Sequence, residues 1–341
     1  MDIESLVRTY RQEVYKYIDE KLPKWHSHPD IQAFYEMLRD YPSRPSKGLR
    51  ATLCILTCEA FGGERSLCLT TAAALEIFQS WVLIHDDIED DSELRRGQLV
   101  LHRKYGVPMA INAGDALHVK MWEILLENRV RLGEGKTLRV LEEFCKMVNE
   151  TTEGQHLELS WVDKKRWDLT AEDYFFMCGK KTSWYTTITP LRLGAIIADA
   201  NNHRLERMIP LGYKLGLAFQ IRDDVLNLTA EERYGKEFAG DIYESKRTLI
   251  LIEALRRCSV EEREKAKKIL DKPRSLKKAE EAEWILDLIK KTGSIEYANG
   301  VAEGLAEEAI KLFEEVFKDV KNTEVKAAIR SLIDLMVSRR W

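Results

Sequence analysis

The stretch LIHDDIEDDSELRRG, residues 83–97, places an acidic run at the end of an otherwise apolar helical pattern. On a helix, Asp86 and Asp90 lie four residues apart on one face, and Asp87 and Asp91 share the adjacent face. Like charges at this spacing repel one another by roughly a few tenths of a kcal/mol per pair, and the cost rises where the helix is buried. A carboxylate cluster of this kind favours a cation, and hard divalent ions such as Mg²⁺ prefer oxygen ligands.

The acidic pattern recurs in the stretch AFQIRDDVLN, where Asp223 and Asp224 are followed one turn later by Asn227. Two facing acidic helices can hold several cations between them. An exposed acidic helix end explains one such stretch, but it explains two of them poorly. Ferritin-like bundles also bind metals between helices, but they use glutamates with paired Glu-x-x-His motifs. This chain has one such spacing, at Glu153 and His156.

Basic residues gather beside helix ends and Gly/Pro breaks, where phosphate contacts are commonly built. Arginine suits bidentate phosphate contacts, and lysine serves as a point charge. Each of these residues alone is typical of a solvated surface, but together they fit two anionic groups, one held by metal and one by basic side chains. They are Lys47, Arg50, Arg95, Arg96, Lys180, Lys181, Lys236, Lys246 and Arg247.

Composition narrows the class of protein. The 341 residues carry a net charge of -4, so no basic field points to nucleic acid. On the sequence pattern, we expect no apolar run of the ~20 residues that a membrane span needs, and the first residues do not have the pattern of a signal peptide. We therefore expect a cytoplasmic protein with no membrane span and no nucleic-acid partner. Length alone suggests two domains, but helical periodicity without a linker favours a single all-α domain over residues 1–341.

Helical periodicity and turn residues give approximate boundaries. A capping-box-like start is expected at Thr170 and a loop over residues 132–136. No GxGxxG, GxxxxGK[ST], HExxH or GxSxG motif competes with the acidic stretches. Helices are predicted over residues 49–61, 67–94, 109–129, 203–228, 247–258, 260–270, 278–291, 294–318 and 322–339.

On these residues the chain resembles the trans-isoprenyl diphosphate synthases, the polyprenyl synthetase family. DDIEDDSELRRG resembles the first aspartate-rich motif of that family and FQIRDDVLN the second, while SKGLR, EGQ, GKKTS and GKEFAGDIYESKRT match its other blocks in order over residues 47–248. The resemblance implies the isoprenoid synthase type I fold, a helical bundle with a central cavity. The chain looks most like the short-chain geranylgeranyl diphosphate synthases. It departs at Asn227, where many members have Asp, and at Gln79, where bacterial members often have His.

The resemblance implies a prenyltransferase that joins isopentenyl diphosphate head to tail with dimethylallyl, geranyl or farnesyl diphosphate. Asp86, Asp90 and Asp223 would bind about three Mg²⁺ ions, with Asp87 and Asp224 supporting them. Arg95, Lys181, Lys236 and Lys246 would grip the allylic diphosphate, while Thr182 and Gln220 face the allylic cation with oxygen dipoles. Lys47, Arg50, Gln79 and Arg96 would hold isopentenyl diphosphate. The absence of an evident side-chain base fits the family mechanism, in which the released pyrophosphate takes the proton.

Three residues upstream of the first motif are predicted to set product length: Phe78, Trp81 and Val82. On pattern alone they fit a plain core, and the resemblance favours a tunnel wall. Trp81 lies five residues before Asp86, roughly 7.5 Å along a helix, and its indole would be the tunnel floor. Val82 leaves room beyond fifteen carbons, and Phe78 offers a second stop, so the predicted product is geranylgeranyl diphosphate, with twenty carbons.

Four alternatives stay open on the sequence. A farnesyl diphosphate synthase would stop at fifteen carbons. A class I terpene cyclase would usually carry an NSE/DTE-type second motif and have little need for Lys47 and Arg50. A non-catalytic synthase subunit would typically lose an aspartate motif, and a helical metal-storage protein is more remote. A homodimer is implied by the resemblance only.

Overall fold

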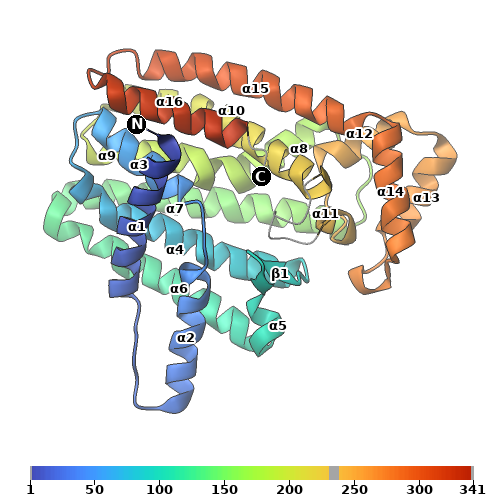
Figure 1. The fold of residues 1–341 in the computed structure, drawn as a ribbon, viewed down its shortest axis with the longest axis horizontal. Coiled ribbons are helices and arrows are strands. Elements are labelled where there is room, and N and C mark those ends of the chain that lie inside the picture. The colour runs from blue at the N-terminus through green and yellow to red at the C-terminus, as the bar shows by residue number, and fades with distance from the viewer. Residues whose placement is uncertain (1, 230–237, 339–341) are drawn as a thin grey trace.

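The computed structural model describes residues 2–229 and 238–338, and within them it is all-helical apart from one short hairpin (Figure 1). The all-α prediction is thus confirmed. The elements are α1 (Ile3–Lys21), α2 (Pro29–Ser43), α3 (Leu49–Ala60), α4 (Arg65–Glu89), β1 (Leu94–Arg95), β2 (Gln98–Leu99), α5 (Leu101–Tyr105), α6 (Val107–Leu126), α7 (Asn128–Asp163), α8 (Ala171–Cys178), η1 (Gly179–Ile188), α9 (Thr189–Ile197), α10 (Asn202–Thr229), α11 (Gly240–Tyr243), α12 (Leu249–Arg257), α13 (Val260–Leu270), η3 (Arg274–Leu276), α14 (Ala279–Lys291), α15 (Ser294–Val316) and α16 (Thr323–Val337).

The long helices pack in an ordered sequence of neighbours. α4 packs against α6, α7 packs against η1, and α10 lies between η1 and α15. Buried apolar side chains form two clusters, one built mainly from α3, α4, α6 and α9 and the other mainly from α8, α10, α12 and α14. Both acidic motifs therefore sit on helices that are fixed by core packing.

Helix α4 contradicts the expectation that the chain has no apolar run long enough to span a membrane. By length and composition alone it is apolar enough to cross a membrane, with a mean hydropathy of 1.6 over its most apolar window. However, 72% of that window is buried inside the molecule. Such burial is typical of the core helix of a soluble protein, because its apolar surface is already covered by other helices.

The acidic helix ends earlier than predicted, at Glu89 rather than near residue 94. The chain then forms a hairpin in which the two turn residues, Arg96 and Gly97, have φ of 55° and 73°. Positive φ at both positions is the pattern of a type I′ hairpin turn, and it is costly for a residue with a side chain, here Arg96. The predicted pairing of Asp87 and Asp91 on one helix face is wrong, because Asp91 lies beyond the helix with φ of 53°.

Two further segments bear on the site. The predicted capping box is confirmed, since Thr170 and Asp173 exchange hydrogen bonds at the start of α8. The predicted loop over residues 132–136 is instead part of α7, which is broken only at Gly133. The segment after α8 is a π-helix, η1, a form that often occurs at functional sites and that helical periodicity did not reveal.

Candidate active site

A cavity of about 850 Å³ lies between α4, α7, η1 and α10, and both acidic motifs reach it. This volume is within the usual range for sites that bind small organic ligands. The fold brings to its wall most of the residues that the sequence singled out, although they are far apart along the chain. Those that line it are Lys47, Arg50, Gln79, Trp81, Val82, Asp86, Arg95, Arg96, Lys181, Thr182, Gln220, Asp223 and Lys246.

Asp86, in the last turn of α4, faces this cavity and attracts two cationic groups. Its Oδ1 accepts hydrogen bonds from Lys181 Nζ and from Gln155 Nε2, each at 3.2 Å. Its Oδ2 accepts one from Arg95 Nη2 at 3.3 Å. The carboxylate therefore lies in a place that favours positive charge, as a metal ligand requires.

Asp90 caps the C-terminal end of α4 and is nearly buried. Burial raises the pKa of its carboxyl group well above the usual value, and the neighbouring Lys246 opposes this shift. The Lys246 ammonium lies 2.7 Å from Asp90 Oδ2 and 3.0 Å from Glu244 Oε2. A buried carboxylate is stable in its charged form only beside a cation, so Asp90 also suits metal binding.

Asp87 has a different environment, because it is fully buried and is not among the described residues that line the cavity. It accepts a hydrogen bond from the Tyr41 hydroxyl and is bound by the Arg95 guanidinium, whose Nε lies 2.9 Å from Oδ1. Asp87 thus holds Arg95 beside Asp86. This placement suits the supporting role that the resemblance implied for it.

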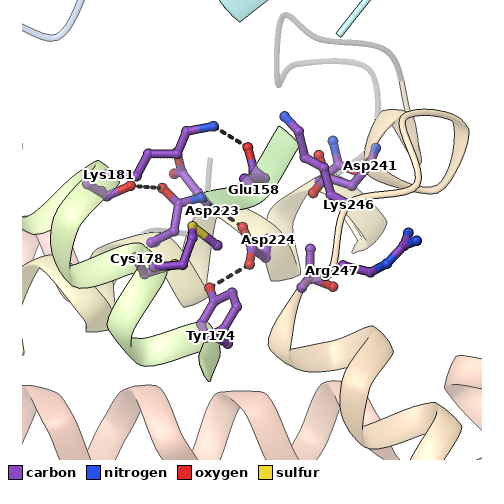
Figure 2. Close-up of a pocket in the computed structure, with 14 residues that line it drawn as sticks. Glu158, Tyr174, Cys178, Lys181, Asp223, Asp224, Asp241, Lys246 and Arg247 are labelled. Atoms are coloured by element: carbon purple, nitrogen blue, oxygen red, sulfur yellow. Dashed lines mark hydrogen bonds and ion pairs between the residues drawn. The ribbon is translucent and has the colours of Figure 1, made fainter. Parts of the chain in front are cut away.

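The second motif is part of α10. Figure 2 shows its two aspartates, Asp223 and Asp224, among the residues that line a pocket. Asp223 lines both the large cavity and a smaller adjoining pocket of about 50 Å³. Asp224 accepts hydrogen bonds from the Tyr174 hydroxyl at 2.7 Å and from Gln220 Nε2 at 2.8 Å. Gln220 Oε1 in turn accepts one from the Thr182 hydroxyl at 3.0 Å. Burial raises the pKa of Asp224 to about 8, so this carboxyl group also needs a nearby cation to lose its proton readily.

Asn227, which stands in the second motif where many family members have Asp, forms hydrogen bonds with the nearby backbone. Its side-chain Oδ1 accepts a hydrogen bond from the backbone N–H of Asp241 at 3.2 Å, and its carbonyl oxygen accepts one from the N–H of Ala239 at 2.9 Å. These bonds hold the start of α11 against α10. The amide oxygen of Asn227 thus already accepts a hydrogen bond from the backbone.

Lys181 and Thr182 are presented by η1, which approaches α7 closely at Gly154. A Cβ atom at Gly154 would lie 2.2 Å from the backbone nitrogen of Lys181, so only glycine fits there. One turn on, Glu158 forms an ion pair with Lys181, whose pKa is raised by Asp86 and Glu158 despite its burial. Sequence reasoning assigned no role to Gln155 or Glu158. The EGQ block that contains Gly154 was the available signal.

Two basic residues predicted to bind isopentenyl diphosphate are held in place by their neighbours. Arg50 donates through Nη2 to the Thr186 hydroxyl at 2.9 Å, and its guanidinium lies 4.5 Å from the centre of the Tyr185 ring. Arg96 donates through Nη1 to the carbonyl oxygen of Arg44 at 3.3 Å. Both side chains are therefore preorganised at the cavity wall.

The three predicted chain-length residues divide into two groups. Trp81 and Val82 line the cavity, whereas Phe78 is fully buried and stands outside the set of described residues that line it. The Phe78 ring meets the Trp81 indole edge-on, with centroids 5.4 Å apart. Phe78 thus lies one layer behind the wall.

Two points concern what the described residues contain. Lys236, predicted to bind the allylic diphosphate, lies in residues 230–237, outside the described part of the chain. Within residues 2–229 and 238–338, no three histidine, cysteine, aspartate or glutamate residues lie close enough to hold a metal ion by themselves. Magnesium commonly keeps waters and takes phosphate oxygens as further ligands, so carboxylates on facing helices still fit it.

The chain is similar to known proteins in both sequence and fold. A sequence model of the polyprenyl synthetase family matches residues 31–289. A geranylgeranyl diphosphate synthase of Sulfolobus acidocaldarius is 33% identical over 314 residues, which are 91% of this chain and 92% of that protein. The structure of a geranylgeranyl pyrophosphate synthetase from Pyrococcus horikoshii superposes over the full length of both chains with a TM-score of 0.85 and 31% identity. A geranylgeranyl pyrophosphate synthase from Corynebacterium glutamicum, complexed with isoprenyl diphosphate and magnesium, gives a TM-score of 0.89 at 26% identity over both full chains.

Proposed function

The chain belongs to the polyprenyl synthetase family and is a trans-prenyltransferase with the isoprenoid synthase fold, and from this premise we propose that it makes geranylgeranyl diphosphate. It would join isopentenyl diphosphate head to tail with dimethylallyl, geranyl and farnesyl diphosphate in turn, within one catalytic domain over residues 1–341. The observation that carries the product length is the cavity wall, where Trp81 is followed by the smaller Val82.

For the metal site, we propose that Asp86, Asp90 and Asp223 bind about three Mg²⁺ ions. Their carboxylate oxygens are hard ligands, and the ammonium groups of Lys181 and Lys246 already lie beside Asp86 and Asp90. The solved relative that contains magnesium and isoprenyl diphosphate supports the same choice of ion. When bound, the ions supply Lewis-acid stabilisation of the departing diphosphate.

The other site residues would bind the two substrates. Arg95, Lys181 and Lys246 would bind the allylic diphosphate at the end of the cavity where the carboxylates lie, a role also predicted for Lys236. Thr182 and Gln220, joined by a hydrogen bond, would direct oxygen dipoles at the allylic cation. On the other side, Lys47, Arg50, Gln79 and Arg96 would hold isopentenyl diphosphate with its alkene in line for attack.

The product limit would follow from the direction of the cavity. The growing chain extends from the diphosphate towards Trp81, about one and a half helical turns behind Asp86. Val82 leaves space at the position beside it, so the chain can pass fifteen carbons before it meets the indole. Phe78, behind the indole, would form the second layer of the floor.

We further propose that the protein is a cytoplasmic homodimer. On α6 several large apolar side chains are exposed, among them Ile111 (40%), Val119 (56%) and Leu126 (43%). An exposed apolar helix face of this kind is typical of an interface between subunits. Light scattering of the purified protein should give twice the 39.6 kDa mass of one chain.

The test of the function is incubation with Mg²⁺, labelled isopentenyl diphosphate and each of the three allylic starters, followed by dephosphorylation and chromatography. Geranylgeraniol as the longest main product supports the proposal. Farnesol would identify a farnesyl diphosphate synthase, and a cyclised hydrocarbon formed without isopentenyl diphosphate would identify a terpene cyclase. Lack of turnover by folded protein with every starter would favour a non-catalytic subunit.

A further inference from the structure

A row of aromatic rings extends from the proposed tunnel floor away from the cavity. The indole of Trp81 lies almost parallel to the imidazole of His118 in α6, with centroids 4.0 Å apart and an angle of 13° between the planes. The edge of the indole contacts Phe78. His118, like Phe78, stands outside the set of described residues that line the cavity. His118 therefore contacts Trp81 without lining the space proposed for substrate.

The imidazole of His118 is itself held in place. Trp122, one turn further along α6, donates a hydrogen bond from Nε1 to His118 Nε2 at 2.9 Å. This nitrogen must be unprotonated to accept, and burial lowers the pKa of His118, which favours the neutral ring. The Trp122 ring in turn meets Phe144 of α7 edge-on, with centroids 6.4 Å apart. The row of rings thus connects the cavity wall on α4 to two neighbouring helices.

We propose that His118 is a positioning residue for product length, which holds the Trp81 indole across the end of the tunnel. The inference rests on the proposed function, in which Trp81 is the tunnel floor. Burial of each further isoprene unit is favourable, so a long product tends to displace a floor that can rotate. An indole changes rotamer more easily when nothing covers its far face. The parallel imidazole covers that face, and the hydrogen bond from Trp122 keeps the imidazole from turning with the indole.

The experiment compares product length in variants that remove different parts of this support. His118→Ala removes the ring, His118→Phe keeps a flat ring without the acceptor nitrogen, and Trp122→Phe removes only the donated hydrogen bond. Leu138→Ala is the matched control, since Leu138 of α7 is also an apolar residue and its side chain is exposed. Each variant is incubated with Mg²⁺, farnesyl diphosphate and excess isopentenyl diphosphate, and the rate of the first condensation is measured separately with dimethylallyl diphosphate.

We expect His118→Ala to raise the ratio of longer products to the twenty-carbon product by about three- to tenfold, the range that one aromatic contact can shift. Trp122→Phe and His118→Phe, which both lose the hydrogen bond but keep a flat ring behind the indole, should give a smaller rise, while Leu138→Ala should stay close to the wild type. The rate of the first condensation should change little, which separates positioning of the floor from general damage to the fold. If circular dichroism shows that His118→Ala does not fold, the difference in product length between Trp122→Phe and Leu138→Ala tests the inference.

Two outcomes separate this inference from the function on which it rests. If the wild type makes no twenty-carbon product, or if Trp81→Ala leaves product length unchanged, the proposed floor itself is wrong. If Trp81→Ala gives longer products while His118→Ala and Trp122→Phe both retain the wild-type distribution, the floor stands and the role of His118 is rejected.

Discussion

The two aspartate motifs have the same arrangement of residues, but the carboxyl groups of their buried aspartates have different partners. In each of them the second aspartate is buried and accepts a hydrogen bond from a tyrosine hydroxyl, from Tyr41 at Asp87 and from Tyr174 at Asp224. At Asp87 the other partner is the Arg95 guanidinium. At Asp224 it is the neutral amide of Gln220.

This difference indicates where each motif obtains its positive charge. The first motif is surrounded by cations of the chain itself, with Arg95 and Lys181 on Asp86 and Lys246 on Asp90. In the second motif, burial raises the pKa of Asp224, and its two hydrogen-bond partners are neutral. We expect an added cation to matter more at Asp224 than at Asp87, because the hydrogen-bond partners of Asp224 are neutral whereas Asp87 already has the Arg95 guanidinium.

The largest effect is expected when the cavity-facing aspartate of either motif is removed. Asp86→Ala and Asp223→Ala should each abolish turnover, because loss of a metal ligand costs several kcal/mol of transition-state stabilisation, at least about a thousandfold in rate. Steady-state rates in Mg²⁺ and far-ultraviolet circular dichroism measure activity and fold. Asp287→Ala, at an exposed aspartate of α14, is the control. Near-normal kinetics in both variants would reject the metal site that joins the two motifs.

The buried aspartates should differ in stability. Asp87→Asn removes the counter-charge of the buried Arg95 guanidinium and should cost about 3 kcal/mol in the free energy of unfolding. Asp224→Asn leaves an amide oxygen that can still accept from the Tyr174 hydroxyl, so we expect a loss within about 1 kcal/mol. Urea unfolding of both variants without metal compares the two sites directly. Equal losses would show that the different partners of the motifs do not matter for folding.

A third prediction concerns a residue that belongs to neither motif. Arg50→Ala should raise the Michaelis constant for isopentenyl diphosphate roughly ten- to hundredfold, because a charge-assisted hydrogen bond is worth about 1.5–3 kcal/mol. The constant for the allylic substrate should change much less, since Arg50 contacts Thr186 and Tyr185 rather than either aspartate stretch. Arg129→Ala, at an exposed residue of α7, serves as the control. An equal rise for both substrates would count against separate sites.

Much of the helical pattern was predictable from sequence. Helix α13 (Val260–Leu270) has the predicted boundaries, because a capping box starts it and a charged outer face defines its period. The end of α4 was not predictable. Its acidic residues are compatible with a helix, and only Gly97 indicated a turn. The positive φ of Arg96 could not be predicted from the residue pattern. Periodicity also missed the π-helix η1, since its ten residues are too few to distinguish its pitch.

The candidate site was also predictable from the sequence only in part. Repetition of the Asp pair identified both motifs, and the resemblance named the basic residues, most of which line one cavity. The partners of the buried aspartates were not identified, because Tyr41 and Tyr174 lie 46 and 50 residues from the carboxylates that they contact. A contact over such a separation depends on tertiary packing and has no spacing rule. The stacking of His118 on Trp81 escaped sequence reasoning for the same reason.

The smallest expected effect on activity comes from making the second motif more like the first in charge. In Asn227→Asp a carboxylate oxygen can still accept from the backbone N–H of Asp241, so α11 should keep its place. The added charge enters a small pocket that Asp223, Asp224 and Asp241 line together with the cationic Lys181, Lys246 and Arg247. Without metal we expect a loss of stability of about 1–3 kcal/mol, because Asn227 is buried and a carboxylate there is taken out of water.

With metal the same charge becomes favourable. The Mg²⁺ concentration for half-maximal rate should fall by about two- to threefold in Asn227→Asp, while the maximal rate changes little, because tighter metal binding acts before the chemical step. Magnesium titrations of the wild type and the variant under saturating substrates measure this. The matched variant Asn227→Gln keeps the amide but lengthens the side chain. If it lowers the half-maximal concentration as much as Asn227→Asp does, the effect comes from geometry and not from charge, and the view that added negative charge in the second motif promotes metal binding is rejected.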